Sequence, residues 1–335
     1  MLEFSLRNVR KVFCFKSLPM MPAILTLISV FLLVSPVVAK EDPRLWLEEI
    51  DSSRALQWVR EQNDVSVARL ASSESFTALR DRLLTIYNSK EKIPLVNKRG
   101  EFVYNFWKDS DHVQGLWRRT TLDSYMTDTP EWESILDLDV LSRKEQETWV
   151  WKGVDCLFPH YRLCIIRLSR GGADATVTRE FDVETRQFIE DGFVLAEAKS
   201  DVSWIDIDTI YVGTDFGEGT LTDSGYPRIV KRWRRGKPLS EAKTVYEGEV
   251  TDIAVAASHD HTPGWEGDFV TRAITFFSNE IFEITEKGLW KIPKQDDAKV
   301  RIDKGRIFFE LRSDWNVAGK TFSQGSLIVS DYKKF

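Results

Sequence analysis

The chain has 335 residues, enough for one large domain or two ordinary ones with a proper hydrophobic core. Charged residues make up 29% of it and apolar residues 42%, a balance that excludes a largely disordered protein. The formal net charge of −6 argues against a nucleic-acid partner, because such partners select basic surfaces.

The first 39 residues differ from the rest and predict a secretory signal peptide. A basic stretch precedes a long apolar run, and Val37-Val38-Ala39 places small residues before a cleavage point at Lys40. An uncleaved membrane anchor is the alternative, but the uninterrupted apolar core Ala23–Val34 is only about a dozen residues long. We therefore expect an exported protein that meets the membrane only through this segment, and only if the segment stays uncleaved.

The cysteines bear on the redox environment of the protein. Cys14 belongs to the leader, whereas Cys156 and Cys164 remain in the mature chain. Two thiols in an exported protein can pair, because such compartments are oxidising. Two buried free thiols are the alternative, since the backbone must also bring the sulfurs together.

Residues 42 to about 90 predict helices. Asp51 or Ser52 can cap a helix over SSRALQWVREQNDVSVARL, and Ser73 or Ser75 can cap the next one, over SESFTALRDRLLTIYNS. In this second segment the apolar residues fall mostly at helical spacing and form one apolar face: Phe76, Leu79, Leu83, Leu84, Ile86 and Tyr87.

From about residue 93 the apolar period changes to two, which indicates short strands separated by turns. Each recurring unit has a mostly apolar inner strand followed by more charged strands, and the inner strands are expected to begin near residues 102, 161, 209, 272 and 306. Their spacing averages about 50 residues, in the range of a propeller blade. A β-sandwich is the main competitor, but the repeated polarity gradient favours a mainly β propeller preceded by N-terminal α-helices.

The stretch RLSRGGAD (167–174) resembles half of the G-x-S-x-G nucleophile elbow. Position 167 is Arg, however, where the strained turn of an elbow needs a small residue. An alternating β-branched run follows instead of a helix, so Ser169 is expected beside a Gly171-Gly172 hairpin turn. No set of Ser, His and Asp can be assembled from the sequence, and no catalytic residue is assigned.

Two further patterns have structural interpretations. The glycine-rich VGTDFGEGTLTDSGYP (212–227) runs into a strand, so we expect a loop between two strands of one blade rather than a phosphate cradle. The cluster KRWRRGK (231–237) surrounds Trp233 with cations, a pattern that can bind single-stranded nucleic acid. In an acidic protein, at the end of a strand, it is expected to be a solvated outer strand.

The segment His259-Asp260-His261 is the remaining candidate for a metal site. Alternating ligands on a strand can meet a metal, but no third ligand is visible nearby and loop-like residues follow. We therefore expect a loop without a metal. No cofactor is predicted either.

Several stretches together resemble the prolyl oligopeptidase family of serine peptidases. DPRLWLEEIDSSRALQWVREQN (42–63) is similar to the D-P-Y-x-W-L-E and W-V-x-x-Q-N patterns that open its members, although Arg44 and Leu45 lie where an aromatic is usual. The likeness continues through residues 105–122, 168–182 and 211–231 and covers essentially the whole mature chain. It looks like a bacterial exported branch of the family, which implies a periplasmic location.

The resemblance implies that catalysis and substrate access belong to different domains. In such proteins a Ser-Asp-His triad in a C-terminal α/β-hydrolase domain cleaves after proline, and a seven-bladed propeller restricts access to short peptides. After the predicted signal peptide over residues 1–39, the resemblance implies a helical segment over 40–92 and an incomplete propeller of about five blades over 93–335. No position matches a triad motif, so this chain alone is expected to be inactive.

Two other functions stay open at this point. The chain can be a non-catalytic propeller that binds peptides or proteins. It can also be the product of a truncated, decayed peptidase gene.

Overall fold

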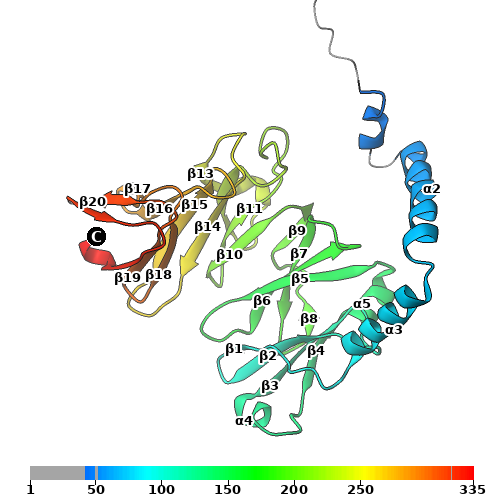
Figure 1. Cartoon of the computed structure of the whole chain (residues 1–335). Helices are drawn as coiled ribbons and strands as arrows, with labels where there is room; N and C mark the ends of the chain where they lie inside the picture. Colours follow the sequence, from blue (N-terminus) through cyan, green and yellow to red (C-terminus); the bar gives the residue numbers. More distant parts are fainter. Residues whose placement is uncertain (1–41, 50–51, 318) are drawn as a thin grey trace, which may run out of the picture. The chain divides into compact units, whose positions relative to one another are not determined.

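The N-terminal helices begin at the serines that the sequence offers as caps. The computed structural model describes residues 42–49, 52–317 and 319–335, so the expected signal peptide lies outside the described residues. Ser52 accepts a hydrogen bond from the backbone of Ala55, and Ser73 accepts one from Phe76. The helical elements are η1 (Leu45–Glu48), α2 (Ser53–Leu70) and α3 (Glu74–Asn88) (Figure 1).

The chain divides into two units, residues 1–81 and 82–335, and the boundary falls inside α3. Side chains of the expected apolar face of α3 are exposed, including Leu79, Leu83 and Tyr87. Within the described residues, no helix has the length and apolar content that a bilayer crossing requires.

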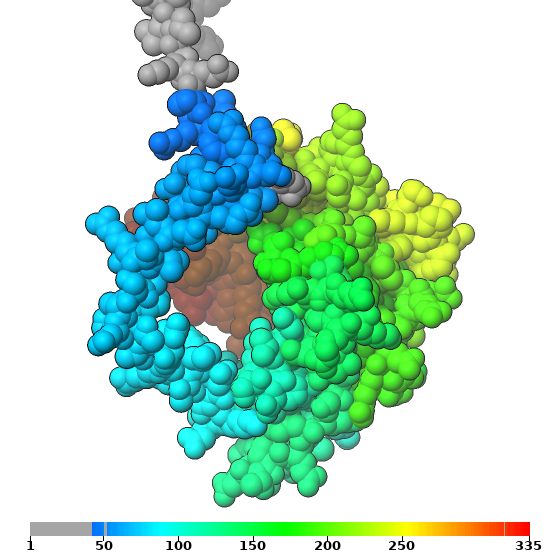
Figure 2. All heavy atoms as spheres, turned by 90° about the vertical axis from the view of Figure 1, so that its right-hand side faces the viewer, coloured from blue at the N-terminus to red at the C-terminus, as the bar shows by residue number. Residues whose placement is uncertain are grey.

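Five successive sheets follow one another between Asn97 and Asp331 and are arranged as the blades of a propeller (Figure 1 and Figure 2). The first sheet contains β1 (Asn97–Arg99), β2 (Phe102–Trp107), β3 (Leu116–Thr121) and β4 (Glu133–Asp137). The second contains β5 (Trp149–Cys156), β6 (Leu163–Arg170) and β7 (Thr176–Asp182), with β8 (Gln187–Phe188) and β9 (Val194–Ala198) both paired to β7. The third contains β10 (Asp201–Asp206), β11 (Thr209–Gly213), β12 (Ile229–Arg234) and β13 (Lys243–Glu247).

The last two sheets follow the same plan. The fourth contains β14 (Ala254–Asp260), β15 (Gly267–Ala273), β16 (Asn279–Thr285) and β17 (Gly288–Lys291). The fifth contains β18 (Lys299–Asp303), β19 (Arg306–Glu310) and β22 (Leu327–Asp331), and a hairpin of β20 (Trp315–Val317) and β21 (Lys320–Phe322) is inserted before β22. Short helices connect some strands: α4 (Leu122–Tyr125), α5 (Leu138–Glu145), η2 (Leu239–Glu241) and η3 (Tyr332–Lys334).

Neighbouring sheets bury aromatic side chains between them. Trp117 of the first sheet stacks on Tyr104 at 5.4 Å between ring centroids and meets Trp151 of the second sheet at 5.6 Å. Trp117 is almost fully buried, as is Phe181 of the second sheet. Large rings at such contacts bury much apolar area, which explains why an aromatic-rich sequence suits this fold. The predicted fold class, mainly β with a five-bladed arrangement after N-terminal helices, is confirmed.

The order of strands within each sheet differs from the prediction. The strands expected to be innermost near 102, 161, 209 and 306 are the second strands of their sheets: β2, β6, β11 and β19. The first strands β5, β10 and β14 are the ones that adjoin one another. A second strand is paired on both edges and covered on both faces, so it carries the most apolar sequence. Ile165 and Ile210 are completely buried on β6 and β11.

Two local expectations in the fourth sheet are wrong. The expected strand near residue 272 ends at Ala273, and Phe276 and Phe277 lie exposed in the turn that follows. The expected loop at His259-Asp260-His261 is partly strand, because β14 runs to Asp260. β14 was missed because the residues before His259 are mostly small and give the strand little apolar character. Phe276 and Phe277 are strongly apolar, so the turn that contains them was mistaken for a strand.

Candidate functional site

Ser169 lies within β6, opposite Val150 of β5, and its side chain is completely buried. Its hydroxyl has no hydrogen-bond partner among the described residues. Gly171 and Gly172, with φ of 60° and 94°, turn the chain into β7, where an elbow would continue into a helix. The serine is therefore placed for packing, as the missing elbow glycine indicated.

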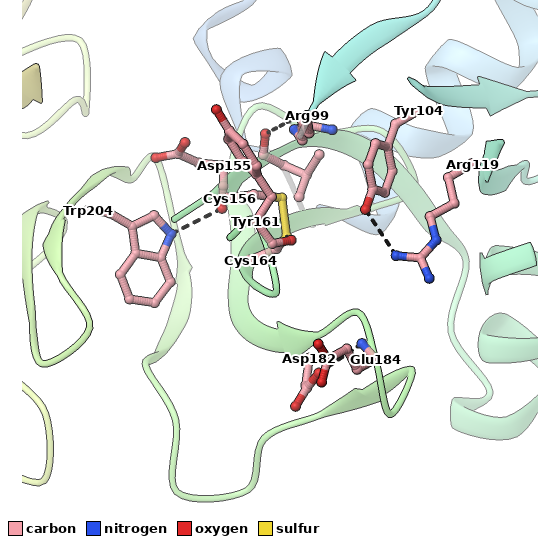
Figure 3. Close-up of a disulfide and its surroundings, with 11 residues drawn as sticks. Arg99, Tyr104, Arg119, Asp155, Cys156, Tyr161, Cys164, Asp182, Glu184 and Trp204 are labelled. Atoms are coloured by element: carbon pink, nitrogen blue, oxygen red, sulfur yellow. Dashed lines mark hydrogen bonds between the residues drawn. A yellow bond between two sulfur atoms is a disulfide. The ribbon is translucent and has the colours of Figure 1, made fainter. Parts of the chain in front are cut away.

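The first strands of the second, third and fourth sheets are joined by hydrogen bonds through Trp204. Its indole Nε1 on β10 donates to the backbone oxygen of Asp155 on β5, at 3.1 Å (Figure 3). His261, which directly follows β14, approaches the backbone oxygen of Trp204 with Nε2, also at 3.1 Å. These contacts hold three inner strands together and place Asp155 and His261 in one region.

Two carboxylates in this region have raised pKa values. Burial raises the pKa of Asp201 on β10 to about 6, although Arg167 on β6 lowers it, and nearby Asp155 raises it further. Burial likewise raises the pKa of Asp155, against the lowering effects of Arg167 and Arg99. We call Asp155, Arg167 and Asp201 the axial cluster. Perturbed groups that gather on an inner wall are candidates for contact with a ligand.

The sequence missed the axial cluster because it misidentified the inner strands. Asp155 and Asp201 stand in the first strands of their sheets, and Arg167 stands in the second strand of the second sheet. Asp155 and Asp201 could have been located as acidic residues within mostly apolar strands. That signal becomes visible only when the first strand of each unit is known.

A serine, a histidine and an aspartate do meet near this wall, but not as a triad. His259 Nδ1 lies 2.9 Å from Asp268 Oδ1, while the contact with Ser203 Oγ comes from the backbone amide of His259. The imidazole therefore has no hydrogen bond to the hydroxyl, which catalysis by a triad requires. The region can hold charges and protons, but it has no arrangement for acyl transfer.

His259 and His261 each have a polar partner within the protein. The rings of His259 and His261 are 4.4 Å apart, yet Asp268 and the backbone of Trp204 are their polar partners. Burial lowers the pKa of His261, and His259 lowers it further. Within residues 42–49, 52–317 and 319–335, no three His, Cys, Asp or Glu side chains are grouped to hold a metal ion.

Several side chains of the basic cluster at residues 231–237 contact other parts of the protein. Trp233 on β12 is buried and its Nε1 donates to the backbone oxygen of Lys237. Lys231 lies over the ring of Phe216, and Arg235 binds the carboxylate of Glu180. The glycine-rich segment is the loop between β11 and β12 of the third sheet. Neither segment presents the open cationic groove that single-stranded nucleic acid needs.

Cys156 and Cys164 form a disulfide between β5 and β6, with the sulfurs 2.05 Å apart (Figure 3). The two residues are directly opposite each other in the register of these strands. Cys156 is next to Asp155, so the disulfide fixes the backbone that carries part of the axial cluster.

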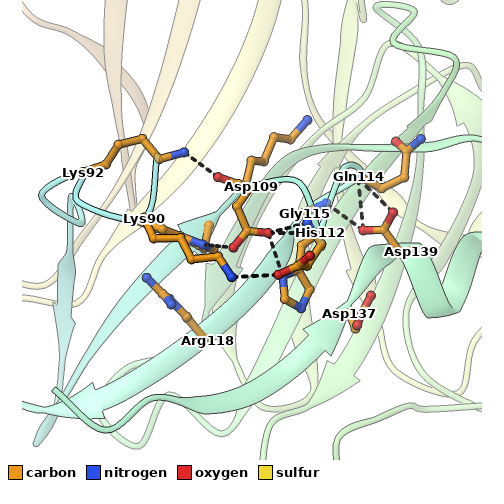
Figure 4. A network of polar contacts seen from close by, with 12 residues as sticks. Lys90, Lys92, Asp109, His112, Gln114, Gly115, Arg118, Asp137 and Asp139 are labelled. Carbon is orange, nitrogen blue, oxygen red and sulfur yellow. Dashed lines mark hydrogen bonds and ion pairs between the residues drawn. The ribbon is translucent and has the colours of Figure 1, made fainter. Parts of the chain in front are cut away.

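A second polar network lies on the first sheet (Figure 4). Burial would raise the pKa of Asp109, but hydrogen bonds from Trp107 and His112 hold it below its usual range. Arg118 lies between the rings of Trp107 and Trp132, at 4.2 Å from each centroid, and burial lowers its pKa to about 10. These contacts stiffen the loop between β2 and β3, so we assign the network a structural role.

The fold defines a propeller-type domain preceded by helices. The model of the prolyl oligopeptidase N-terminal beta-propeller domain matches residues 35–262, and the chain belongs to this family.

Named relatives of the chain are peptidases. It is 38% identical over 307 residues to the uncharacterized peptidase y4nA of Sinorhizobium fredii (strain NBRC 101917 / NGR234), covering 87% of this chain and 42% of that protein. It is 29% identical over 304 residues to the uncharacterized peptidase RP174 of Rickettsia prowazekii (strain Madrid E), covering 85% of this chain and 41% of that protein.

A solved structure extends the likeness. A post-proline cleaving enzyme from Rickettsia typhi superposes with a TM-score of 0.80 at 30% identity, over 86% of this chain and 44% of that one. The chain thus spans less than half the length of these relatives.

Proposed function

We propose that the chain is the helical and propeller portion of a serine peptidase that cleaves peptides after proline. The observation that carries this proposal is the likeness to the post-proline cleaving enzyme, with a TM-score of 0.80 at 30% identity. A peptidase of this kind needs an activated serine and an oxyanion hole. Ser169 is buried within a strand, so the proposal assigns that chemistry to sequence outside the blades described here.

The propeller would select which peptides reach the catalytic serine. Its inner wall carries the axial cluster, whose charges can attract or repel the charged ends of a peptide. A wall built from paired strands is rigid, so a folded protein would be excluded while a short peptide would pass. In this proposal the partners are short peptides, and the propeller acts on access rather than on bond cleavage.

We also propose that the protein is exported, to the periplasm, after removal of residues 1–39. The Cys156–Cys164 disulfide supports export, since disulfides persist in oxidising compartments and are rare in the cytosol. Cell fractionation followed by N-terminal sequencing tests this directly. Mature protein that begins at Lys40 is expected, and cytosolic protein that keeps the leader would contradict it.

A chimera tests the peptidase proposal. Residues 42–335 would replace the matching portion of the Rickettsia typhi enzyme, and turnover of a chromogenic proline peptide would be measured with and without a serine-reactive inhibitor. We expect inhibitor-sensitive turnover by the chimera and none by this chain alone. Inhibitor-sensitive turnover by this chain alone would overturn the assignment. So would a chimera whose catalytic serine reacts with the inhibitor but which cleaves no proline peptide.

A further inference from the structure

A hollow of about 550 Å³ lies between the fourth and fifth sheets, and none of its lining residues belongs to the axial cluster. Its walls include five aromatic rings, two carboxylates and one lysine: Trp265, Phe269, Trp290, Tyr332, Phe335, Glu266, Glu283 and Lys333. We call it the Glu283 hollow. Aromatic walls around an acidic group are the chemistry that proteins use to hold organic cations.

The register of the fourth sheet places the carboxylate among the rings. Phe269 on β15 is opposite Glu283 on β16, which is opposite Trp290 on β17. Directly opposite residues on neighbouring strands project from the same face of a sheet. Glu283 therefore stands in a row between two aromatic side chains.

Tyr332, the first residue of η3 after the fifth sheet, covers this row. Its ring lies 6.2 Å from Phe269 and 6.4 Å from Trp290, at steep angles of 68° and 71°. Its hydroxyl donates to Glu283 Oε2 at 2.9 Å, and burial together with this carboxylate raises the pKa of Tyr332. The tyrosine thus stays a neutral donor and orients Glu283 without neutralising its charge.

Glu283 forms no salt bridge with another described residue, although Lys333 also lines the hollow. Arg272 and Lys291 both pair with Glu280, which lies three residues before Glu283 on β16 and therefore projects from the opposite face of the strand. A half-buried carboxylate without a counter-charge favours a cation that comes from elsewhere. One oxygen accepts from Tyr332, and Oε1 remains available for a second donor.

Trp265 completes the walls and already attracts an ammonium group. Its ring lies against Gly305, where a side-chain Cβ would come within 2.3 Å of the ring atoms. Lys333 Nζ lies 4.7 Å from the centroid of this ring. The chain's own lysine therefore shows the type of group that this wall accepts.

We propose that the Glu283 hollow binds an alkylammonium cation, with the charge beside Glu283 and the alkyl groups against the rings. Two sources carry this chemistry, the side chain of a lysine in a peptide and a small quaternary ammonium compound. The site is separate from peptide cleavage and does not depend on it. Its role is recognition of a positively charged group.

Binding would be measured by tryptophan fluorescence and calorimetry on the whole chain. The probes are tetramethylammonium, choline, an acetylated lysine amide, and 3,3-dimethylbutanol as a neutral analogue of choline. We expect saturable binding of cations and at least about tenfold weaker binding of the neutral analogue. Preference for the lysine amide would identify a peptide as the source, and preference for choline a small molecule. Equal binding of choline and its neutral analogue, or no binding of any cation, would overturn the proposal.

Matched variants locate the site. Glu283→Gln keeps the shape of the side chain and should weaken cation binding about tenfold, while Lys333→Ala should strengthen it by removing a competing ammonium. Glu310→Gln, at an exposed ion pair with Lys299, should leave binding unchanged. Circular dichroism and thermal melting confirm that each variant is folded. A folded Glu283→Gln protein with unchanged affinity would refute the assignment.

Discussion

Arg235 holds the carboxylate of Glu180 with both Nη atoms, at 2.8 Å each, across the boundary between the third and second sheets. Glu180 is completely buried on β7, and the backbone amide of Phe193 donates to the same carboxylate at 2.8 Å. Arg235 also donates to the backbone oxygen of Ile207. The pair therefore has good geometry and ties two neighbouring blades together.

Glu180→Gln should lower the free energy of unfolding by about 3–5 kcal/mol. The substitution leaves the largely buried guanidinium of Arg235 with only the exposed Asp208, at 3.7 Å, as a counter-charge. Breaking a buried pair from one side carries this cost. Urea denaturation followed by tryptophan fluorescence measures the change.

An exposed ion pair provides the control. Lys299 and Glu310 are 3.0 Å apart, with side chains 57% and 55% exposed. Glu310→Gln should change the free energy of unfolding by less than about 1 kcal/mol, because solvent screens such pairs. Equal losses for the two variants would show that burial does not set the strength of the Glu180–Arg235 contact.

The disulfide should contribute about 2–3 kcal/mol to stability, because it closes a short loop between cysteines eight positions apart. Intact mass with and without reductant checks whether the bond forms. Reductant should lower the melting temperature of the native protein and leave that of a Cys156→Ala, Cys164→Ala double variant unchanged. If the mass shows free thiols but the melting temperature of the native protein is the same with and without reductant, the disulfide does not contribute this stability.

The sequence predicted the fold class because a period of two, repeated over units of similar length, is a property of the whole chain. It did not predict which strand lies innermost. Burial alone controls apolar content, and the central β6 and β11 are more buried than the first strands that face the axis. A polarity gradient therefore locates the middle of a sheet rather than its inner edge.

The axial cluster and the Glu283 hollow depend on contacts between residues that the spacing of residues in the sequence does not reveal. The local pattern of RLSRGGAD predicted a turn at Gly171-Gly172, which the structure places directly after β6. Asp201 and Arg167 come from different sheets and approach each other only after the blades pack. Glu283 has aromatic neighbours because of strand register, which a one-residue shift would destroy.

Asp201→Asn should stabilise the protein above pH 6 and remove part of its pH dependence. The folded pKa of about 6 lies above the value of about 3.9 for an unfolded aspartate, so the folded chain holds the proton more tightly. Stability from this group is fully present below pH 4 and is lost as the pH rises through 6. The variant should gain about 1–3 kcal/mol at pH 8. Urea midpoints from pH 4 to pH 8 check this, and a native protein and variant with parallel profiles would contradict it.

Ser169→Ala should leave stability unchanged or raise it by up to about 1 kcal/mol, because the buried hydroxyl has no partner to lose. Thr222→Val is the matched control, since Thr222 is buried and its hydroxyl donates to the backbone oxygen of Ile253 at 3.2 Å. Losing that bonded hydroxyl should cost about 1–3 kcal/mol. Thermal melting compares the two variants, and a fluorophosphonate probe reports any reactive serine. A large loss of stability for Ser169→Ala would mean that the hydroxyl has a stabilising partner. Probe labelling that disappears with this substitution would mean that Ser169 is reactive.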